Sequence, residues 1–312
     1  MIRWVLLMFL AAGAQAAEST VDIDTAATIY QAAAVRDQVR ASLGVMPEHI
    51  RRLFATDSSA KLSEPQLAAV SAAAAHGFRI DVFETPALQA LADHLDPATA
   101  KKTQAFLASD LGKRMVTADV ALATLGEANI DKVMSGEISA PSTPKRDVLF
   151  DKLERASHST ESTVQIFLGM GQAVAVGTAI GSGMDPVAVE QRARKSGEAS
   201  RAELEENMRL PMRRFMTYGY RDLSDSDLKH MLTFLESAAG QRYVAAYKAS
   251  MDAGFDAMGR RTGEQLGESL RELAQADVSA PQSMPPSGIA APPPVLPHTT
   301  KPSASPDPAQ PQ

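Results

Sequence analysis

The chain contains no cysteine. Disulfide bonds, thiolate metal sites and a cysteine nucleophile are therefore excluded, and so is a lipid anchor on an N-terminal cysteine. Aromatic residues make up only 5% of the sequence, while much of its apolar content is alanine. Because alanine favours helices, and strands favour aromatic and β-branched residues, this composition favours a helical protein over a sheet protein.

An excess of positive charge is also missing. The formal net charge is −6 and the isoelectric point is about 5.6. A dedicated nucleic-acid-binding protein needs a basic face to neutralise phosphates. We therefore expect no nucleic-acid partner.

The N-terminus has only a short apolar run. The apolar stretch 4–12, which follows Arg3, has about nine residues, whereas a membrane-spanning helix needs about 20. Ala14 and Ala16 form the small-x-small pattern of a cleavage site. We expect residues 1–16 to be a cleaved signal peptide and the mature chain to reach the periplasm of a Gram-negative cell. A membrane anchor is the alternative.

Proline is scarce in most of the chain, but eleven of its 19 prolines fall in residues 281–312. Proline removes backbone donors and favours an extended chain, so this segment is predicted to be a disordered Pro-rich tail. The tail is either a spacer or a ligand for a groove that binds proline-rich peptides. A solvated tail without a partner is the simpler interpretation.

The rest of the chain carries helix signals. A capping box occupies Ser63–Gln66, a capping residue precedes proline at Asp96–Pro97 and Asp185–Pro186, and acids follow a serine at Ser224–Asp227. No stretch shows sustained alternation of β-branched residues, and no Asn-Gly or Asp-Gly hairpin turn occurs. We therefore predict an all-α, multi-helix, bundle-like domain. Helical spacing is clearest in one apolar stripe, formed by Leu228, Met231, Leu232, Leu235 and Ala238.

An internal repeat is the most specific feature of the sequence. Residues 95–126 match residues 223–254 without a gap, and both copies contain the string F-L-x-S-x-x-G-x-R-x-V. The repeat predicts two related helical halves, 17–138 and 146–280, joined by a linker at 139–145. The motif residues are Phe106, Ser109, Gly112 and Arg114 in the first copy and Phe234, Ser237, Gly240 and Arg242 in the second.

The string is typical of a helical corner used twice. Each phenylalanine would anchor the end of one helix in the core, and each serine would cap the next helix. The glycine costs up to about 1 kcal/mol against alanine in a helix, so we expect it where two helices approach closely. An anion site at this helix N-terminus, with Arg114 or Arg242 as a clamp, is the functional alternative.

The second copy carries a resemblance. The string Leu223–Arg242, with Tyr218-Gly219-Tyr220 before it, resembles the C-terminal signature of the bacterial envelope family called domain of unknown function 2059. The match covers residues 205–260, and residues 95–126 are a weaker version. The resemblance implies an exported, all-α protein and carries over no catalytic residue.

A glycine-rich, uncharged segment spans residues 163–184. It lacks the lysine of a phosphate-binding loop, so it does not predict nucleotide binding. It is long enough to cross a bilayer and contains the helix-packing pair Gly177 and Gly181, but polar residues and glycines dilute it. We expect a fully buried central helix rather than integral membrane insertion.

Other candidate chemistry is weak. Two Ser-x-x-Lys pairs, Ser58/Lys61 and Ser142/Lys145, lack the companion motifs of acyl-transfer enzymes. No two histidines have metal-ligand spacing on a helix. The sequence thus assigns no catalytic, cofactor-binding or metal residue. The charged run 190–209 is interpreted as a solvated helix face, with a partner-binding face as the alternative.

These observations favour an exported periplasmic protein that binds a ligand or another protein, with another envelope protein as one partner considered. An enzyme with an unrecognised site is the first alternative, and it would require several polar groups brought together in a cleft. A membrane-associated envelope protein that uses residues 163–184 is the second. The molecular activity itself is not predicted.

Overall fold

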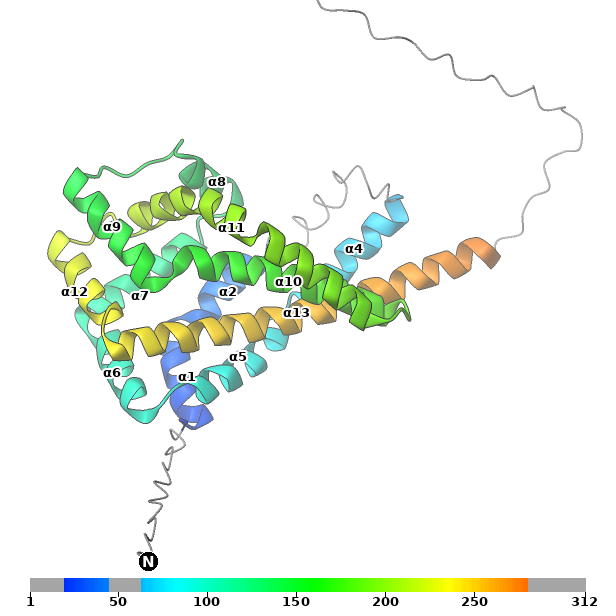
Figure 1. The fold of residues 1–312 in the computed structure, drawn as a ribbon, viewed down its shortest axis with the longest axis horizontal. Coiled ribbons are helices and arrows are strands. Elements are labelled where there is room, and N and C mark those ends of the chain that lie inside the picture. Colours follow the sequence, from blue (N-terminus) through cyan, green and yellow to red (C-terminus); the bar gives the residue numbers. More distant parts are fainter. Residues whose placement is uncertain (1–19, 45–62, 280–312) are drawn as a thin grey trace, which may run out of the picture.

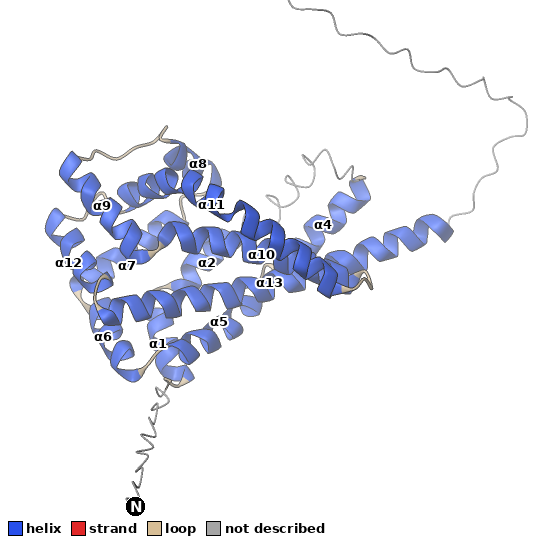
Figure 2. Cartoon of the chain, in the orientation of Figure 1, coloured by secondary structure: helices blue, strands red, loops and turns tan. Residues whose placement is uncertain are grey.

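The computed structural model describes residues 20–44 and 63–279, and every regular element in them is a helix (Figure 2). The all-α prediction is therefore confirmed. The helices are α1 (Ile23–Ala32), α2 (Val35–Leu43), α4 (Glu64–Gly77), α5 (Ile80–His94), α6 (Pro97–Ala108), α7 (Asp110–Ala123), α8 (Glu127–Ser135), α9 (Pro144–Ser157), α10 (Ser159–Gly181), α11 (Pro186–Gly219), α12 (Asp225–Leu235) and α13 (Ala238–Ser279).

The structure confirms the helix starts that were predicted from capping residues. Ser63 donates its backbone N–H to the Gln66 side chain at 2.8 Å and closes the capping box of α4. Asp96 and Asp185 accept backbone N–H groups at the starts of α6 and α11. Ser224 accepts from the Asp227 N–H at 3.1 Å at the start of α12. These side chains satisfy donors that the first turn of a helix leaves free.

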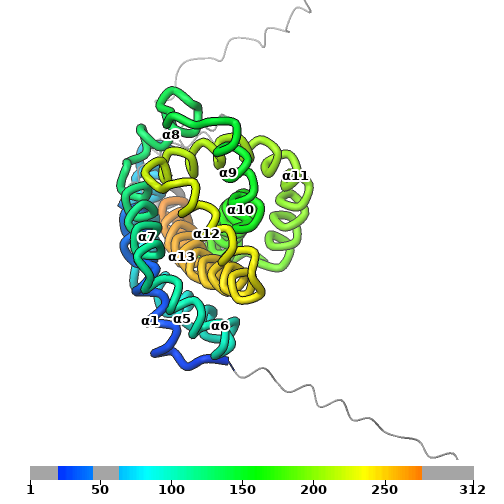
Figure 3. The backbone as a smooth tube through the Cα atoms, turned by 90° about the vertical axis from the view of Figure 1, so that its left-hand side faces the viewer, coloured from blue at the N-terminus to red at the C-terminus, as the bar shows by residue number. Residues whose placement is uncertain are grey.

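The longest helix, α13, runs through the molecule and contacts helices from both ends of the chain (Figure 1). It packs most extensively on α10, then on α5 and α4. The hairpin formed by α10 and α11 lies on the other side of α13 from α5, as the view along the bundle shows (Figure 3). Both predicted halves therefore share α13 as a common support.

Two apolar clusters form most of the core. One joins α1, α2, α5 and α6 to α13 around the buried ring of Phe83, which meets Phe255 edge-on at 5.2 Å between ring centroids. The other joins α9, α11 and α12 around Phe150. Phe106 and Met115 pack against both clusters, so the first helical corner connects them.

Small residues bring α10 and α13 into backbone contact. A Cβ added at Gly177 would lie 2.3 Å from the Arg260 carbonyl oxygen, and one at Gly263 would lie 2.2 Å from the Val174 oxygen. The two helices run parallel in register, with Gly181 beside Gly267. The packing role predicted for Gly177 and Gly181 is therefore confirmed.

The expectation of a fully buried α10 is wrong. Phe167 and Ile180 on this helix are 55% and 45% exposed. In the part of the chain that the structure describes, α10 is the one helix long and apolar enough to cross a membrane, and a third of its most apolar window is buried. The reason for the difference is that α11 and α13 cover only part of its circumference.

The helical corner occurs twice, as predicted. Ser109 accepts the Gly112 N–H at 3.0 Å and donates to the Phe106 carbonyl at 2.6 Å. Ser237 makes the same two bonds, with the same lengths, to Gly240 and Phe234. A Cβ at Gly112 would lie 2.1 Å from the Phe106 oxygen, so the glycine is needed for the close approach.

The two corners face each other. The rings of Phe106 and Phe234 stack with centroids 4.0 Å apart and planes 3° from parallel. Both rings are partly buried and pack against the core clusters, and they stack on one another where the clusters meet, which the sequence did not predict. Such a pair adds about 0.5–1.5 kcal/mol beyond the area that it buries.

The other domain predictions fare differently. The connection between α8 and α9 ends at Thr143, so α9 begins inside the predicted linker 139–145. The signal peptide 1–16, with Ala14 and Ala16, and the tail 281–312 lie outside the described residues. The halves 17–138 and 146–280 stay a prediction.

Candidate functional site: an interior cavity beside Asp119

A cavity of about 390 Å³, which extends inward from the surface and is partly open to solvent, lies among α7, α10, α11, α12 and α13. Its volume falls within the range of about 300–1,000 Å³ that is usual for small-molecule sites. It is lined mainly by apolar side chains. Its aromatic, methionine and acidic side chains are Met115, Asp119, Met212, Phe215, Met216, Tyr220, Met231, Tyr243, Tyr247 and Met251.

The two repeats supply matching parts of the wall. Leu107 of the first copy corresponds in sequence to Leu235 of the second, and both line the cavity. The same holds for Val116 with Val244, and for Asp119 with Tyr247. The cavity thus lies between α7 and its counterpart, the first part of α13. Its chemistry differs between the copies because one position carries a carboxyl group and the other a phenol.

Asp119 is the one charged side chain in the lining. One carboxylate oxygen accepts the Tyr220 hydroxyl at 2.6 Å. Removal from bulk water raises the pKa of Asp119 from an ordinary 3.8 to about 7, and the hydrogen bond from Tyr220 partly offsets that rise. Its second oxygen has no hydrogen-bond partner within the described ranges.

Two tyrosine hydroxyls accompany Asp119. Tyr243 and Tyr247 line the cavity with ring centroids 6.0 Å apart, and neither hydroxyl has a protein partner in residues 20–44 and 63–279. Burial raises the pKa of both phenols, and the nearby charge of Asp119 adds to the rise. The cavity lining therefore includes an unpaired carboxylate oxygen on Asp119 and the unpaired hydroxyls of these two tyrosines.

Some of the remaining polar side chains of the lining have partners, whereas the hydroxyls of Ser162 and Thr163 on α10 have none within the described ranges. Gln38 donates to the Ala33 carbonyl at 2.8 Å. Ser157 and Ser159 are hydrogen-bonded to each other. Asp119, Tyr243 and Tyr247 come from α7 and α13, whereas the rest of the lining is mainly apolar and rich in methionine. Methionine is flexible, so such a lining adapts to the shape of a guest molecule.

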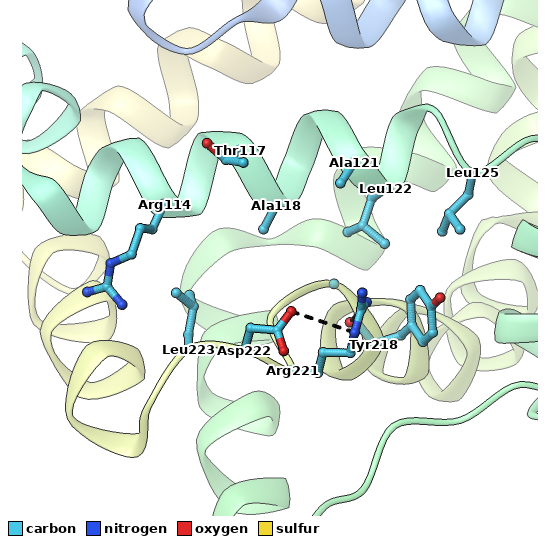
Figure 4. A pocket seen from close by; sticks show the side chains of 11 residues that line it. Arg114, Thr117, Ala118, Ala121, Leu122, Leu125, Tyr218, Arg221, Asp222 and Leu223 are labelled. Atoms are coloured by element: carbon cyan, nitrogen blue, oxygen red, sulfur yellow. Dashed lines mark hydrogen bonds and ion pairs between the residues drawn. The ribbon is translucent and has the colours of Figure 1, made fainter.

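A second hollow lies on the outer side of α7. This outer groove, of about 450 Å³, is bounded by α7 and by residues 218–223, with Arg114 at one end (Figure 4). Leu122 lines both the outer groove and the interior cavity. It packs against Gly219, where a Cβ would lie 2.2 Å from its side chain. Leu122 therefore separates the two spaces.

The motif residues predicted from the repeat do not line the cavity. Arg114 binds Asp227 through two hydrogen bonds of 2.7 and 2.9 Å, and Arg242 binds Asp96 at 2.9 Å. Each arginine thus reaches the first helix of the other copy. Both guanidinium groups thus pair with carboxylates in this structure, and an anion clamp at the corner stays an untested alternative.

The weaker sequence candidates remain apart from the cavity. Ser142 donates to Asp147 at 2.6 Å at the start of α9, while Ser58 and Lys61 lie outside the described residues. Across the described ranges no three potential metal ligands of the histidine, cysteine or acidic types cluster. In the charged run, exposed pairs such as Arg194 and Glu198 agree with a solvated face.

Sequence reasoning missed Asp119 and the tyrosines. The repeat offered a signal, since Asp119 aligns with Tyr247 in an otherwise apolar register. A buried position with an acid in one copy and a phenol in the other indicates a polar group inside the core.

Comparisons of this chain with models of protein families, with curated proteins and with solved structures find no match.

Proposed function

We propose that this protein binds a small, largely apolar molecule in the interior cavity and acts as a binding module without chemistry of its own. The observation that carries the proposal is the cavity beside Asp119, where a mainly apolar lining includes an unpaired oxygen of Asp119 and the unpaired hydroxyls of Tyr243 and Tyr247. Buried polar groups are nearly always paired, with protein, water or ligand. Unpaired groups around an apolar space are what a ligand with one polar end would satisfy.

The same lining favours binding over catalysis. It contains one carboxyl group and no histidine, lysine or arginine. This carboxyl group has a single hydrogen bond within the described residues, the one from the Tyr220 hydroxyl. General acid–base and nucleophilic mechanisms need a second group in reach of the first. An enzyme with an unrecognised site therefore remains the less supported alternative.

The cellular setting is part of the proposal. The segment 1–16 supports export to the periplasm, and the string Leu223–Arg242 supports membership of the family called domain of unknown function 2059. A binding protein in this compartment would meet small molecules that cross the envelope, and another envelope protein is the partner class that we propose.

A neutral dye tests the cavity. Prodan is small and uncharged, and its emission shifts to the blue in apolar surroundings. The protein should bind it with a saturable blue shift, and Val116→Phe should abolish that shift by filling the cavity. Val148→Phe is the matched control, because Val148 is 52% exposed on α9.

Circular dichroism must show that both variants keep their helices. A blue shift that survives Val116→Phe, or that disappears equally in Val148→Phe, would place the dye elsewhere and contradict the proposal.

A membrane surface is the second candidate. Met184, Val187 and Phe167, on or next to the α10–α11 hairpin, are each 55–57% exposed, an unusual number of large apolar side chains for one hairpin. Co-sedimentation with lipid vesicles that is lost in Met184→Ser/Val187→Ser would favour it over the cavity.

A further inference from the structure

We infer the chemical class of the ligand, an inference that rests on the proposed function: the ligand is an amine that carries an alkyl or aryl group. Its protonated nitrogen would lie against Asp119 and the hydroxyls of Tyr243 and Tyr247. Its apolar part would lie among the methionines of the lining. Three properties of the lining lead to this class.

The first property is the sign of the charge. Asp119 is the only ionisable group other than the tyrosines in the lining, and no cationic side chain balances it. Its one strong hydrogen bond comes from a neutral hydroxyl, that of Tyr220. A buried carboxylate without a cationic partner is costly, and a cationic ligand removes that cost.

The second property is the number of unpaired acceptors. Asp119, Tyr243 and Tyr247 all line the cavity, and the second oxygen of Asp119 and the two hydroxyls have no hydrogen-bond partner among the described residues. Asp119 on α7 and the two tyrosines on α13 belong to the lining of one cavity, and the charge of Asp119 adds to the rise in the pKa of both phenols. An ammonium group has three N–H donors, as lysine has, whereas an alcohol has one.

The third property is the aromatic wall. Tyr220, Tyr243, Tyr247 and Phe215 present ring surface to the cavity. Aromatic faces attract cations, and the attraction is stronger where water is excluded. Ligands that carry a carboxylate or phosphate find no positive group in this lining and would meet the charge of Asp119. Fatty acids and phosphorylated compounds are therefore excluded as preferred ligands.

Three probes of equal chain length test this inference: octylamine, octanol and octanoate, titrated into the full chain by calorimetry at pH 7.5. Octylamine is protonated at this pH, as an ordinary amine is. Octylamine should bind at least about tenfold more tightly than octanol, the ratio expected of one charge-assisted hydrogen bond. Octanoate should bind most weakly.

Asp119→Asn is the decisive variant. It keeps the size of the side chain and an acceptor for Tyr220 but removes the charge. It should weaken octylamine binding at least about tenfold and leave octanol binding within about twofold. Asp131→Asn, at an exposed site on α8, is the matched control and should change neither affinity.

The outcomes separate the two proposals. Octanol binding equal to octylamine binding, or an equal loss of both in Asp119→Asn, overturns the amine inference and leaves the cavity as a site for neutral molecules. Tighter binding of octanoate overturns it as well. Failure of prodan and all three probes to bind overturns the proposed function itself.

Discussion

Asp119 combines two roles that oppose each other. As a carboxyl group inside a mainly apolar cavity it destabilises the fold when charged, and as the anion of the cavity it would attract a ligand. Sites that bind or react are often less stable than the core around them for this reason. The pH dependence of stability should reveal the cost.

Asp119→Asn should flatten that pH dependence. Because the pKa of Asp119 is raised to about 7 in the folded protein, the folded state holds its proton more tightly than the unfolded state. Its stabilising contribution is complete below about pH 3.8 and is lost as the pH rises through about 7. Wild type should therefore lose stability relative to Asp119→Asn between pH 5 and 8, by an amount on the order of 2–4 kcal/mol.

Urea unfolding at pH 5, 6.5 and 8 measures this difference, with Asp131→Asn as the control. The groups facing Asp119 are Tyr220, Tyr243 and Tyr247, which stay neutral in this range because burial raises the pKa of each. Asp96 and Asp227 have the opposite effect on the pH dependence, because their hydrogen bonds lower the pKa of each carboxyl group. The stability that they contribute to the fold is lost only as the pH falls below about 3.8, outside the range of this experiment. Parallel curves for wild type and Asp119→Asn would refute a raised pKa.

At the scale of elements, the helical corner shows how close contact between backbones determines which residue is tolerated at one position. Gly240 lies in the first turn of α13, where alanine would favour the helix by up to about 1 kcal/mol. A Cβ at this position would lie 1.9 Å from the carbonyl oxygen of Phe234, which belongs to the backbone. Steric overlap with backbone cannot be relieved by a rotamer change, so packing overrides propensity.

Gly240→Ala should therefore destabilise the protein by about 1–3 kcal/mol, as overpacking in a dense core does. Gly171→Ala is the matched control, because Gly171 lies on the exposed side of α10 and no atom lies within 4 Å of a Cβ added there. Thermal unfolding should show a lower midpoint for Gly240→Ala and an unchanged or higher midpoint for Gly171→Ala. Equal midpoints would mean that the corner relaxes freely.

Much at the element scale could be predicted from sequence. Caps and the corner depend on residues within a few positions of one another, so Ser63, Ser109 and Ser237 were assigned correctly. Pairing across the molecule could not be predicted from these local patterns. Gly177 signalled a close helix contact, but nothing near it identified Gly263 as its neighbour, and the exposed face of α10 followed from how little of it α11 and α13 cover.

The candidate site could not be predicted from the sequence for the same reason. Its lining comes from residues between Ala33 and Met251, and a cavity depends on volumes left unfilled by all of them. The repeat was the only sequence signal that related residues on two sides of the cavity to each other. The corner motif that repeats most clearly, F-L-x-S-x-x-G-x-R, shapes the walls through ion pairs such as Arg114–Asp227 without lining the cavity beyond its leucines.

At the scale of the whole molecule, the two predicted halves depend on α13. Ser250 in this helix donates to the carbonyl of Ala87 at 2.8 Å, and Gly254 lies directly under the ring of Phe83. The core of the first half is therefore closed by a helix from the second. The two predicted halves are therefore expected to fold as one cooperative unit.

A fragment of residues 17–138 should accordingly fail to fold alone. Without α13, the buried surfaces of Phe83 and Ala87 would face water, and the fragment would keep helix content but lose fixed packing. The full chain should unfold in a single transition, with the same midpoint by far-UV and near-UV circular dichroism. Mixing the fragment with residues 146–280 should restore the near-UV signal, because the second fragment supplies α13. A sharp, cooperative melt of 17–138 by itself would show instead that the repeat marks two independent domains, and the cavity between their corners would then be an interface rather than part of one core.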